Sequence, residues 1–266
     1  MPEDRLVVRP SRHPDLVGFL TLLRREVLRF IILPNQTLVP PILNAALYIL
    51  VFGFALSTRI REIHGIPYIL YIFPGLVMMG VVNGAYLNNC SSLFISRNEQ
   101  FIQDLLVSPL SYWEMVLAYT LGGALRGVIV GVLTLVTGYA FLGLHMHDPL
   151  ALGFFLVVSS LLCAAFGNIV GLWAEQWDHV AIYLNYVITP LVFLGGVFYS
   201  LDMLPAAWRE VNLLNPIFYM VNGFRYATLG ERDISPLVSA GMTIGLATIL
   251  FTVAVELFRR GWKLRA

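Results

Sequence analysis

The chain has 266 residues, of which 58% are hydrophobic and only 12% are Asp, Glu, Lys or Arg. Soluble domains carry about 25% charged residues, so this composition excludes an ordinary soluble protein and predicts an integral membrane protein. The formal net charge of +1 gives no sign of a strongly basic surface, and we expect no nucleic-acid partner.

The chain contains a single lysine, Lys263, in the sequence RRGWKLRA. The phosphate-binding loop of P-loop ATPases needs a glycine-rich turn followed by Lys and Ser or Thr, because that ammonium reaches the β- and γ-phosphates. We therefore expect no ATP, Mg²⁺ or other cofactor site in this chain. Cys90 and Cys163 both fall in apolar runs and are expected to be buried free thiols.

Several apolar segments are long enough to cross a membrane, which takes about 20 helical residues for about 30 Å of hydrocarbon. Six qualify, at roughly residues 36–57, 67–91, 113–143, 150–174, 180–200 and 236–258. The expected fold is all-α, with a six-span transmembrane domain at 34–266 after an N-terminal segment at 1–33. More Lys and Arg residues lie on the side of the termini than on the other side, which predicts cytoplasmic termini.

Residues 15–31 have the pattern of a helix that lies on the membrane surface. Apolar side chains share one face of this helix: Leu16, Phe19, Leu20, Leu23, Val27, Phe30 and Ile31. Arg25 and Arg29 are expected on the opposite face and Arg24 at the border, where they would meet anionic headgroups. The alternative is an ordinary amphipathic helix packed on a soluble domain, but the chain offers no such domain.

The segment SRNEQFIQDLLVS, residues 96–108, predicts a short polar helix between two apolar runs. Ser96 and Glu99 fit a capping box at its start, and Pro109 ends it because the residue before a proline is pushed out of the helical region. Its apolar ridge consists of Phe101, Ile102, Leu105 and Leu106, bordered by Gln100, Gln103 and Asp104. A helix of about ten residues is marginal alone in water, so it must dock in a groove of a cytoplasmic partner or beneath its own bundle.

The segment at 201–234 has two apolar pieces that are too short to cross a bilayer and are interrupted by polar residues. Apolar runs of this length are more often re-entrant or interfacial. We expect two half-helices, broken at Asn215 and Pro216, that dip into the outer leaflet and return. Irregular backbone at that depth requires surrounding protein or a water-filled cavity, so a cavity open to the outside is implied.

Arg126 lies inside the third predicted span, where a charged side chain costs about 2.5–3.5 kcal/mol. It should therefore face the bundle or a wet cavity and have a partner. Gly123, Gly127 and Gly131 repeat beside it at four-residue spacing, which permits close approach of another helix. A structural role for Arg126, bonded to carbonyls or a carboxylate, is favoured, and contact with substrate is the alternative.

The predicted outer loop HMHD, residues 145–148, offers two imidazoles and a carboxylate that could hold a metal ion. No other ligand type clusters near it in the sequence. A turn before Pro149 is the favoured interpretation, and we expect no metal site.

Four motifs follow one another along the chain: FPGLVMMGVVNGAY, FIQDLLVSPLSYWEMVLA, GGVFYSLDMLP and LNPIFYMVNGFRY. Together they resemble the ABC type-two exporter permeases, in the branch of YadH-type inner-membrane permeases, and the resemblance covers residues 39–265. It implies a bacterial inner-membrane permease that forms a homodimer and binds two copies of a separate ATPase subunit, which holds ATP and Mg²⁺.

The resemblance also assigns roles to segments. The helix at 96–108 would be the coupling helix in a cleft of the ATPase, through Glu99, Phe101, Ile102, Asp104, Leu105 and Leu106; Asp104 stands where many members have Glu. The helix at 15–31 would be the interface helix, with Arg24, Arg25 and Arg29. The segment at 201–234 would be the outer re-entrant pair, with Asn215, Pro216 and Arg225 at its interruptions.

The first and fifth spans of such permeases border the translocation route, so the resemblance implies that aromatic residues there line it. The candidate path residues are Tyr48, Phe52, Arg126, Tyr183 and Tyr186. For each aromatic, the alternative is lipid contact or packing within the bundle.

Taken together, the residues and the resemblance predict the transmembrane subunit of an ATP-driven exporter of a glycan, a lipid-linked sugar, a drug or another amphiphile. The alternative is a secondary transporter driven by an ion gradient, which would need carboxylates or histidines in mid-membrane. The acidic residues near the spans cluster instead at their ends, as Glu114, Glu175, Asp178 and Glu256 do. The sequence shows no nucleophile–base pair or metal cluster that would indicate an enzyme.

Overall fold

The computed structural model describes residues 16–32, 34–37, 39–52, 62–143 and 146–264. A hairpin of β1 (Glu62–Ile63) and β2 (Ile66–Pro67) is antiparallel, with Ile63 opposite Ile66. The other regular elements in these ranges are helices, in agreement with the all-α expectation. They are α1 (Leu16–Ile31), α2 (Pro34–Thr37), α3 (Val39–Leu50), α4 (Tyr68–Asn98), α5 (Phe101–Val107), α6 (Tyr112–Leu142), α7 (Pro149–Trp173), α8 (Trp177–Tyr183), the π-helix η2 (Leu184–Ile188), α9 (Thr189–Phe193), the 3₁₀ turn η3 (Leu201–Met203), α10 (Ala206–Leu213), α11 (Pro216–Leu229) and α12 (Pro236–Arg259).

Four of the described helices are long and apolar enough to cross a membrane, namely α4, α6, α7 and α12. They correspond to the second, third, fourth and sixth predicted spans. The first predicted span is present as α3, of 12 residues, and its part at 53–57 lies outside the described residues. The fifth is divided among α8, η2 and α9, which follow one another from Trp177 to Phe193. The total of six spans therefore stays a prediction.

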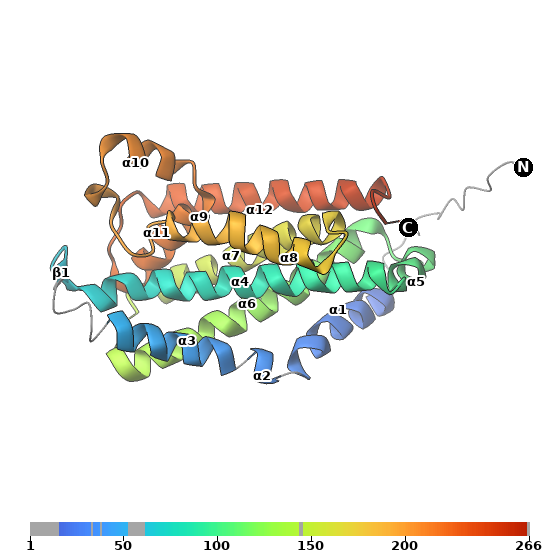
Figure 1. Cartoon of the computed structure of the whole chain (residues 1–266), viewed down its shortest axis with the longest axis horizontal. Coiled ribbons are helices and arrows are strands. Elements are labelled where there is room, and N and C mark those ends of the chain that lie inside the picture. Colours follow the sequence, from blue (N-terminus) through green and yellow to red (C-terminus); the bar gives the residue numbers. More distant parts are fainter. Residues whose placement is uncertain (1–15, 33, 38, 53–61, 144–145, 265–266) are drawn as a thin grey trace, which may run out of the picture.

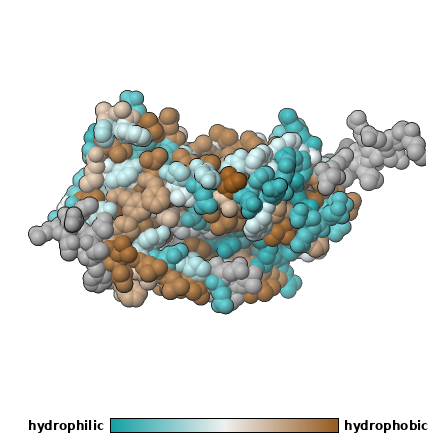
Figure 2. Space-filling model, in the orientation of Figure 1, coloured by the Kyte–Doolittle hydropathy of each residue, from teal (hydrophilic) through white to brown (hydrophobic). Residues whose placement is uncertain are grey.

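Helices α4, α7 and α12 run towards the same end of the bundle and α6 runs in the opposite direction, so the shorter elements lie at two ends (Figure 1). One end carries α5, the start of α1 and the end of α12, while the opposite end carries the β-hairpin and α10. The first and last described residues thus lie at the α5 end. Figure 2 shows hydrophilic residues gathered towards that end and apolar side chains around the middle of the bundle.

Helix α4 occupies the middle of the bundle and packs against α3, α6, α7 and α11. Small residues allow the closest approach. A Cβ on Gly127 would lie 2.8 Å from Ser160 Oγ and 2.9 Å from Ala85 Cβ. The predicted glycine seam of α6 is therefore confirmed, and it faces both α4 and α7.

Buried side-chain amides connect the central helices. Asn89 Nδ2 donates to the carbonyl of Ala164 at 3.0 Å, and Asn168 Nδ2 donates to Thr120 Oγ1 at 2.9 Å. These bonds tie α7 to α4 and to α6. Cys90 and Cys163 are buried free thiols, as predicted.

The segment 201–234 contains two helices, α10 and α11, with the break at the predicted position. Asn215 caps α11, because its side chain accepts from the backbone N–H of Ile217 at 3.0 Å, and Pro216 is the first helical residue. Helix α11 is buried between α4, α7 and α12, whereas α10 is largely exposed. Insertion of the pair into an outer leaflet stays a prediction.

Candidate functional site

The predicted coupling helix begins later in the structure than the sequence suggests. Residues 96–98 form the last turn of α4, and α5 starts only at Phe101. Ser96 is 2% exposed, and its hydroxyl accepts from Arg25 at 2.9 Å and from Tyr119 at 3.2 Å. The predicted capping box of Ser96 and Glu99 is therefore wrong, because distant partners occupy the serine and keep it inside α4.

A capping box is present one helix later, at the start of α6. There Glu114 accepts from the backbone N–H of Ser111 at 2.8 Å. The predicted end of the coupling helix is confirmed, since Ser108 has an extended backbone before Pro109.

Ile102 packs α5 against the helix bundle. Its side chain is 2% exposed and belongs to a cluster that includes Leu110, Met115 and Tyr119. Leu105 and Leu106 are half-buried against the same cluster. The expected apolar ridge is thus divided. Its inner part, Ile102, Leu105 and Leu106, packs against the helix bundle of the same chain, which was the alternative prediction.

The outer part of α5 faces away from the bundle. Phe101 is 50% exposed and Val107 is 72% exposed, although both are apolar. Glu99 and Asp104 are exposed beside them. This accessible surface, made of Phe101, Asp104 and Val107, is called the α5 outer face below.

Helix α1 presents a carboxylate to the bundle. Glu26 is 0% exposed and accepts from Ser92 Oγ at 2.6 Å. It also pairs with Arg25 at 3.2 Å and with Arg29 at 3.7 Å. Glu26 is not among the residues predicted from sequence, although an isolated acid between Arg25 and Arg29 in an apolar helix is a usable signal.

The prediction that Arg25 and Arg29 point away from the bundle, towards lipid headgroups, is wrong. Arg29 Nη2 donates to Asn88 Oδ1 at 3.0 Å, and Arg25 bonds Ser96, so both reach into the bundle. Arg24 is exposed, as expected. The helical pattern alone could not show this, because the polar groups of α4 that attract the arginines are distant in sequence.

A groove of about 240 Å³ lies between α3, α4 and α6. Arg126 and Tyr48, both predicted path residues, line it from α6 and α3, and Asn83 lines it from α4. Arg126 Nη1 donates to Asn88 Oδ1 at 3.5 Å, the oxygen that Arg29 also approaches. None of the described residues that line the groove is acidic.

The other predicted path residues separate into two groups. Phe52 lies 6.2 Å from the Tyr48 ring and 5.4 Å from that of Phe198. Tyr183 packs on Trp173 at 5.1 Å, and Tyr186 is 77% exposed. The structure therefore brings Tyr48 and Arg126 into one groove, with Phe52 beside Tyr48, whereas Tyr183 and Tyr186 do not line this groove.

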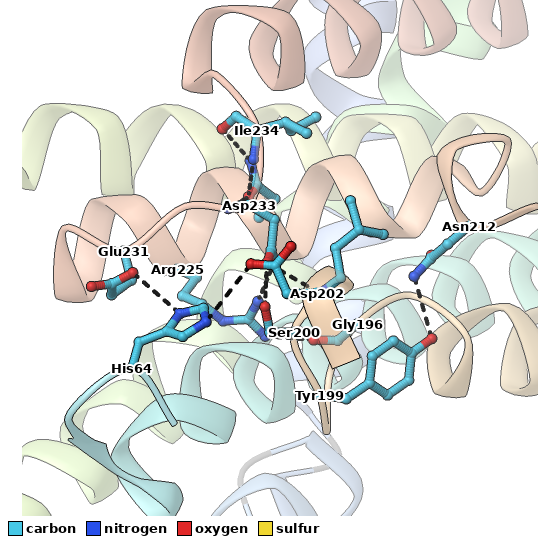
Figure 3. A network of polar contacts seen from close by, with 12 residues as sticks. His64, Gly196, Tyr199, Ser200, Asp202, Asn212, Arg225, Glu231, Asp233 and Ile234 are labelled. Atoms are coloured by element: carbon cyan, nitrogen blue, oxygen red, sulfur yellow. Dashed lines mark hydrogen bonds and ion pairs between the residues drawn. The ribbon is translucent and has the colours of Figure 1, made fainter. Parts of the chain in front are cut away.

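At the opposite end of the bundle, Arg225 is the centre of a buried network (Figure 3). It pairs with Asp233 at 3.3 Å, donates to the carbonyl of Gly196 and lies 4.2 Å from the Tyr71 ring centre. Asp233 also accepts from Ser200 Oγ at 2.6 Å. Arg225 thus joins α11 to α4 and to the loops on either side, rather than marking an interruption.

A second contact at this end connects the β-hairpin to the same loops (Figure 3). His64 lies 3.6 Å from Glu231 and 4.0 Å from Asp202, and all three side chains are substantially exposed. This arrangement could not be predicted from local sequence patterns, because the three residues come from separate segments.

The HMHD motif forms a helix start. Asp148 accepts from the backbone N–H groups of Leu150 and Ala151 at 3.0 Å, and Pro149 is the first residue of α7. His145 lies outside the described residues. Among the residues that are described, no group of three metal-ligand side chains occurs.

Comparisons with known proteins give consistent matches over most of the chain. A model of the family described as "ABC-2 type transporter" matches residues 17–229. The inner membrane transport permease YadH of Escherichia coli strain K12 is 35% identical over 254 residues, which are 96% of this chain and 99% of that protein. Nodulation protein J of Rhizobium leguminosarum bv. viciae is 21% identical over 92% of this chain and 95% of its own length.

Proposed function

Because the chain belongs to the ABC-2 type transporter family, we propose that it is the membrane subunit of an ATP-driven exporter, coupled to a separate ABC ATPase. The chain itself is a multi-pass inner-membrane permease. In the proposed assembly, two copies form the translocation pathway, and two copies of the ATPase hold ATP and Mg²⁺ in the cytoplasm.

The α5 outer face is the observation that carries this proposal. Phe101 and Val107 present apolar surface at the end of the bundle, beside the carboxylate of Asp104. A seven-residue helix has little stability of its own, so it must be held by tertiary contacts. Ile102 holds the inner side, and a groove on the ATPase would receive the outer side.

Movement of α5 would reach α1 through a shared pocket. Phe101, Arg25 and Arg29 line the same pocket between α1, α4 and α5. Arg25 bonds the last turn of α4 at Ser96. A displacement of α5 when the ATPase closes on ATP would therefore act on the contact between α1 and α4.

The same contacts connect α5 with the groove. Arg29 and Arg126 both donate to Asn88 Oδ1, one from α1 and one from α6. A shift of α1 along α4 would change the position of Asn88 relative to Arg126. This gives a continuous path from the α5 outer face to the candidate translocation residues.

Six crossings with both termini in the cytoplasm are the proposed topology. Helix α3 and the α8–η2–α9 segment would supply the two crossings beyond the four long helices. The shared end of the first and last described residues supports an even number of crossings (Figure 1). The α10–α11 pair would then form the outer re-entrant segment.

An ion-gradient-driven secondary transporter is less well supported. Such proteins carry ionisable groups in mid-membrane. Within α4, α6, α7 and α12, the only acidic residues are Glu114, near the start of α6, and Glu256, near the end of α12.

The test is co-purification of an ABC ATPase subunit from the same organism with the permease. Phe101→Asp should lower the recovered ATPase at least about tenfold, which corresponds to about 1.4 kcal/mol of binding, because a carboxylate would be buried in the contact. The amount of permease extracted from membranes should not change. Trp208→Asp is the matched control, since Trp208 is 54% exposed on α10 at the opposite end.

Two outcomes would contradict the proposal. Full recovery of the ATPase with Phe101→Asp would remove the α5 outer face from the contact. ATP hydrolysis by the purified permease alone would show that it does not depend on a partner for nucleotide chemistry.

A further inference from the structure

We propose that a pocket between α9 and α10 binds a neutral aromatic compound of one or two rings that carries a single N–H or O–H donor. The pocket has a volume of about 230 Å³. It is lined from α10, at the end of the bundle opposite to α5, and it shares no lining residue with the groove between α3, α4 and α6 (Figure 1). The proposal goes beyond the proposed function and requires neither the ATPase nor a transported substrate.

The walls of the pocket are apolar and come from separate parts of the chain. Leu191 and Leu194 line it from α9 and its end, and Trp208 and Val211 line it from α10. Tyr199 lines it from the segment between these helices. In the described part of the chain, every residue that lines the pocket is uncharged, so an ionic ligand would lose its hydration without compensation. The ligand is therefore expected to be neutral.

Asn212 adds a hydrogen-bond acceptor to this apolar pocket. It is 3% exposed, and its Oδ1 has no hydrogen-bond partner in the structure. Its Nδ2 donates to the Tyr199 hydroxyl at 3.4 Å, and that hydroxyl donates to the carbonyl of Leu194 at 2.7 Å (Figure 3). Because the hydroxyl has a single proton, it cannot also donate to Asn212. The orientation of the amide is thus fixed, and Oδ1 is the atom that stays free.

The free oxygen of Asn212 requires a donor from outside the chain. Buried polar groups are normally satisfied by protein or by ordered water, and an ordered water needs about two to four polar partners. The neighbouring amide of Asn215 is already occupied, because it donates to the carbonyl of Leu191 at 2.6 Å and accepts from the N–H of Ile217 at 3.0 Å. A ligand with one N–H or O–H group would satisfy Asn212 without adding a second unpaired polar atom.

The size of the pocket and its aromatic side chains favour a ring over an alkyl chain. A cavity of about 150 Å³ with aliphatic and aromatic walls binds benzene, so the larger volume here accommodates one or two rings. Trp208 and Tyr199 offer offset or edge-to-face contact with such a ligand. Trp208 and Val211 are 54% and 50% exposed, so the ligand can enter from the surface. An alkyl chain would fill the same space but has no donor for Asn212.

The experiment measures binding of 5-fluoroindole to the full-length permease in dodecyl maltoside by fluorine NMR. Partition into empty micelles gives a background that rises linearly with probe concentration, whereas binding to the pocket should be saturable. Indole should displace the probe. N-methylindole keeps both rings but lacks the donor, so its affinity should be about fivefold lower than that of indole. Indole-3-carboxylate is the anionic control and should not displace the probe.

Two variants assign the signal to this pocket. Asn212→Leu removes the acceptor and keeps a side chain of similar size, so it should weaken binding of indole about fivefold and leave indole and N-methylindole with similar affinities. Val211→Trp fills the pocket from an exposed position and should abolish saturable binding. Val238→Trp, at an exposed position of α12 that does not line the pocket, is the matched control and should bind as the unmodified protein does.

Four results would overturn the proposal. They are a signal no larger than that of empty micelles, equal affinities of indole and N-methylindole for the unmodified protein, displacement by indole-3-carboxylate, and unchanged binding in folded Val211→Trp protein. The comparison of the two indoles uses the unmodified permease, so it decides the role of the donor even if Asn212→Leu does not fold. Because the ATPase is not needed, loss of its co-purification would leave the pocket assignment intact.

Discussion

Glu26 of α1 and Ser92 of α4 form a buried hydrogen bond of 2.6 Å, with no exposed surface on the carboxylate. The bond fixes an amphipathic N-terminal helix against the bundle at a single register. Arg25 and Arg29 flank it and bond α4 at Ser96 and Asn88. Helix α1 is thus attached to the bundle through polar contacts, while its apolar side chains Leu16 and Leu20 stay exposed, as the predicted interface helix requires.

Glu26→Ala is expected to destabilise the permease by about 2–3 kcal/mol. Removing one member of a buried ion pair costs about 3–5 kcal/mol. The smaller figure allows for solvent around the arginines, whose side chains are 42% and 30% exposed. The midpoint of thermal unfolding in detergent measures the effect. Glu99→Ala, at an exposed position, is the control, and equal midpoints for the two variants would contradict the structural role of Glu26.

Arg225 and Asp233 should show strong coupling in a double-mutant cycle. Asp233→Asn leaves the Arg225 guanidinium, which is 1% exposed, without its ion pair. The free energy of unfolding should therefore fall by about 3–5 kcal/mol. Arg225→Met leaves the carboxylate with the donors of Ser200 and Leu201. The double variant should be less destabilised than the sum of the single variants by at least about 1 kcal/mol. Strict additivity would mean that the pair does not hold the α11 end of the bundle.

The end of α5 could be predicted from sequence, but its beginning could not. Pro109 acts on its immediate neighbour, so Ser108 had to leave the helix. Ser96 had the local signature of a cap, yet its hydroxyl is used by Arg25, 71 residues earlier in the chain. A capping prediction from local sequence fails where a residue distant in the chain forms a hydrogen bond with the same side chain.

The membrane spans could likewise be predicted from sequence, whereas the way they pack together could not. Helices α4, α6, α7 and α12 stand out because their length and hydropathy exceed what a soluble core needs. Tyr48 and Arg126 could each be selected from sequence as unusual residues in an apolar segment. Their position in one groove depends on how α3 packs beside α6, which a single sequence does not encode in any local pattern.

Gly127 and Gly153 should respond in opposite directions to alanine. At Gly127 the new Cβ would lie 2.8 Å from Ser160 Oγ, so helix α6 must move. The free energy of unfolding should therefore fall by about 1–3 kcal/mol. At Gly153, in α7, no atom lies within 4 Å of the new Cβ, and alanine should stabilise the helix by about 0.5–1 kcal/mol. Thermal unfolding of both variants checks the pair, and a neutral Gly127→Ala would argue against the tight seam.

The C-terminal segment should detach from the 175–179 loop only at acidic pH. Lys263 Nζ donates to Glu175 at 2.5 Å, and this bond holds the pKa of the Glu175 carboxyl below its ordinary value of 4.5. The contact is therefore complete above pH 4.5 and is lost as the pH falls through the lower pKa. Lys263 lies 5.5 Å from the Trp173 ring and 5.4 Å from that of Trp262, so tryptophan emission should change below pH 4.5. Glu175→Gln should lack the acidic transition, and Glu99→Gln should retain it. An identical transition in Glu175→Gln would assign the emission change to another group.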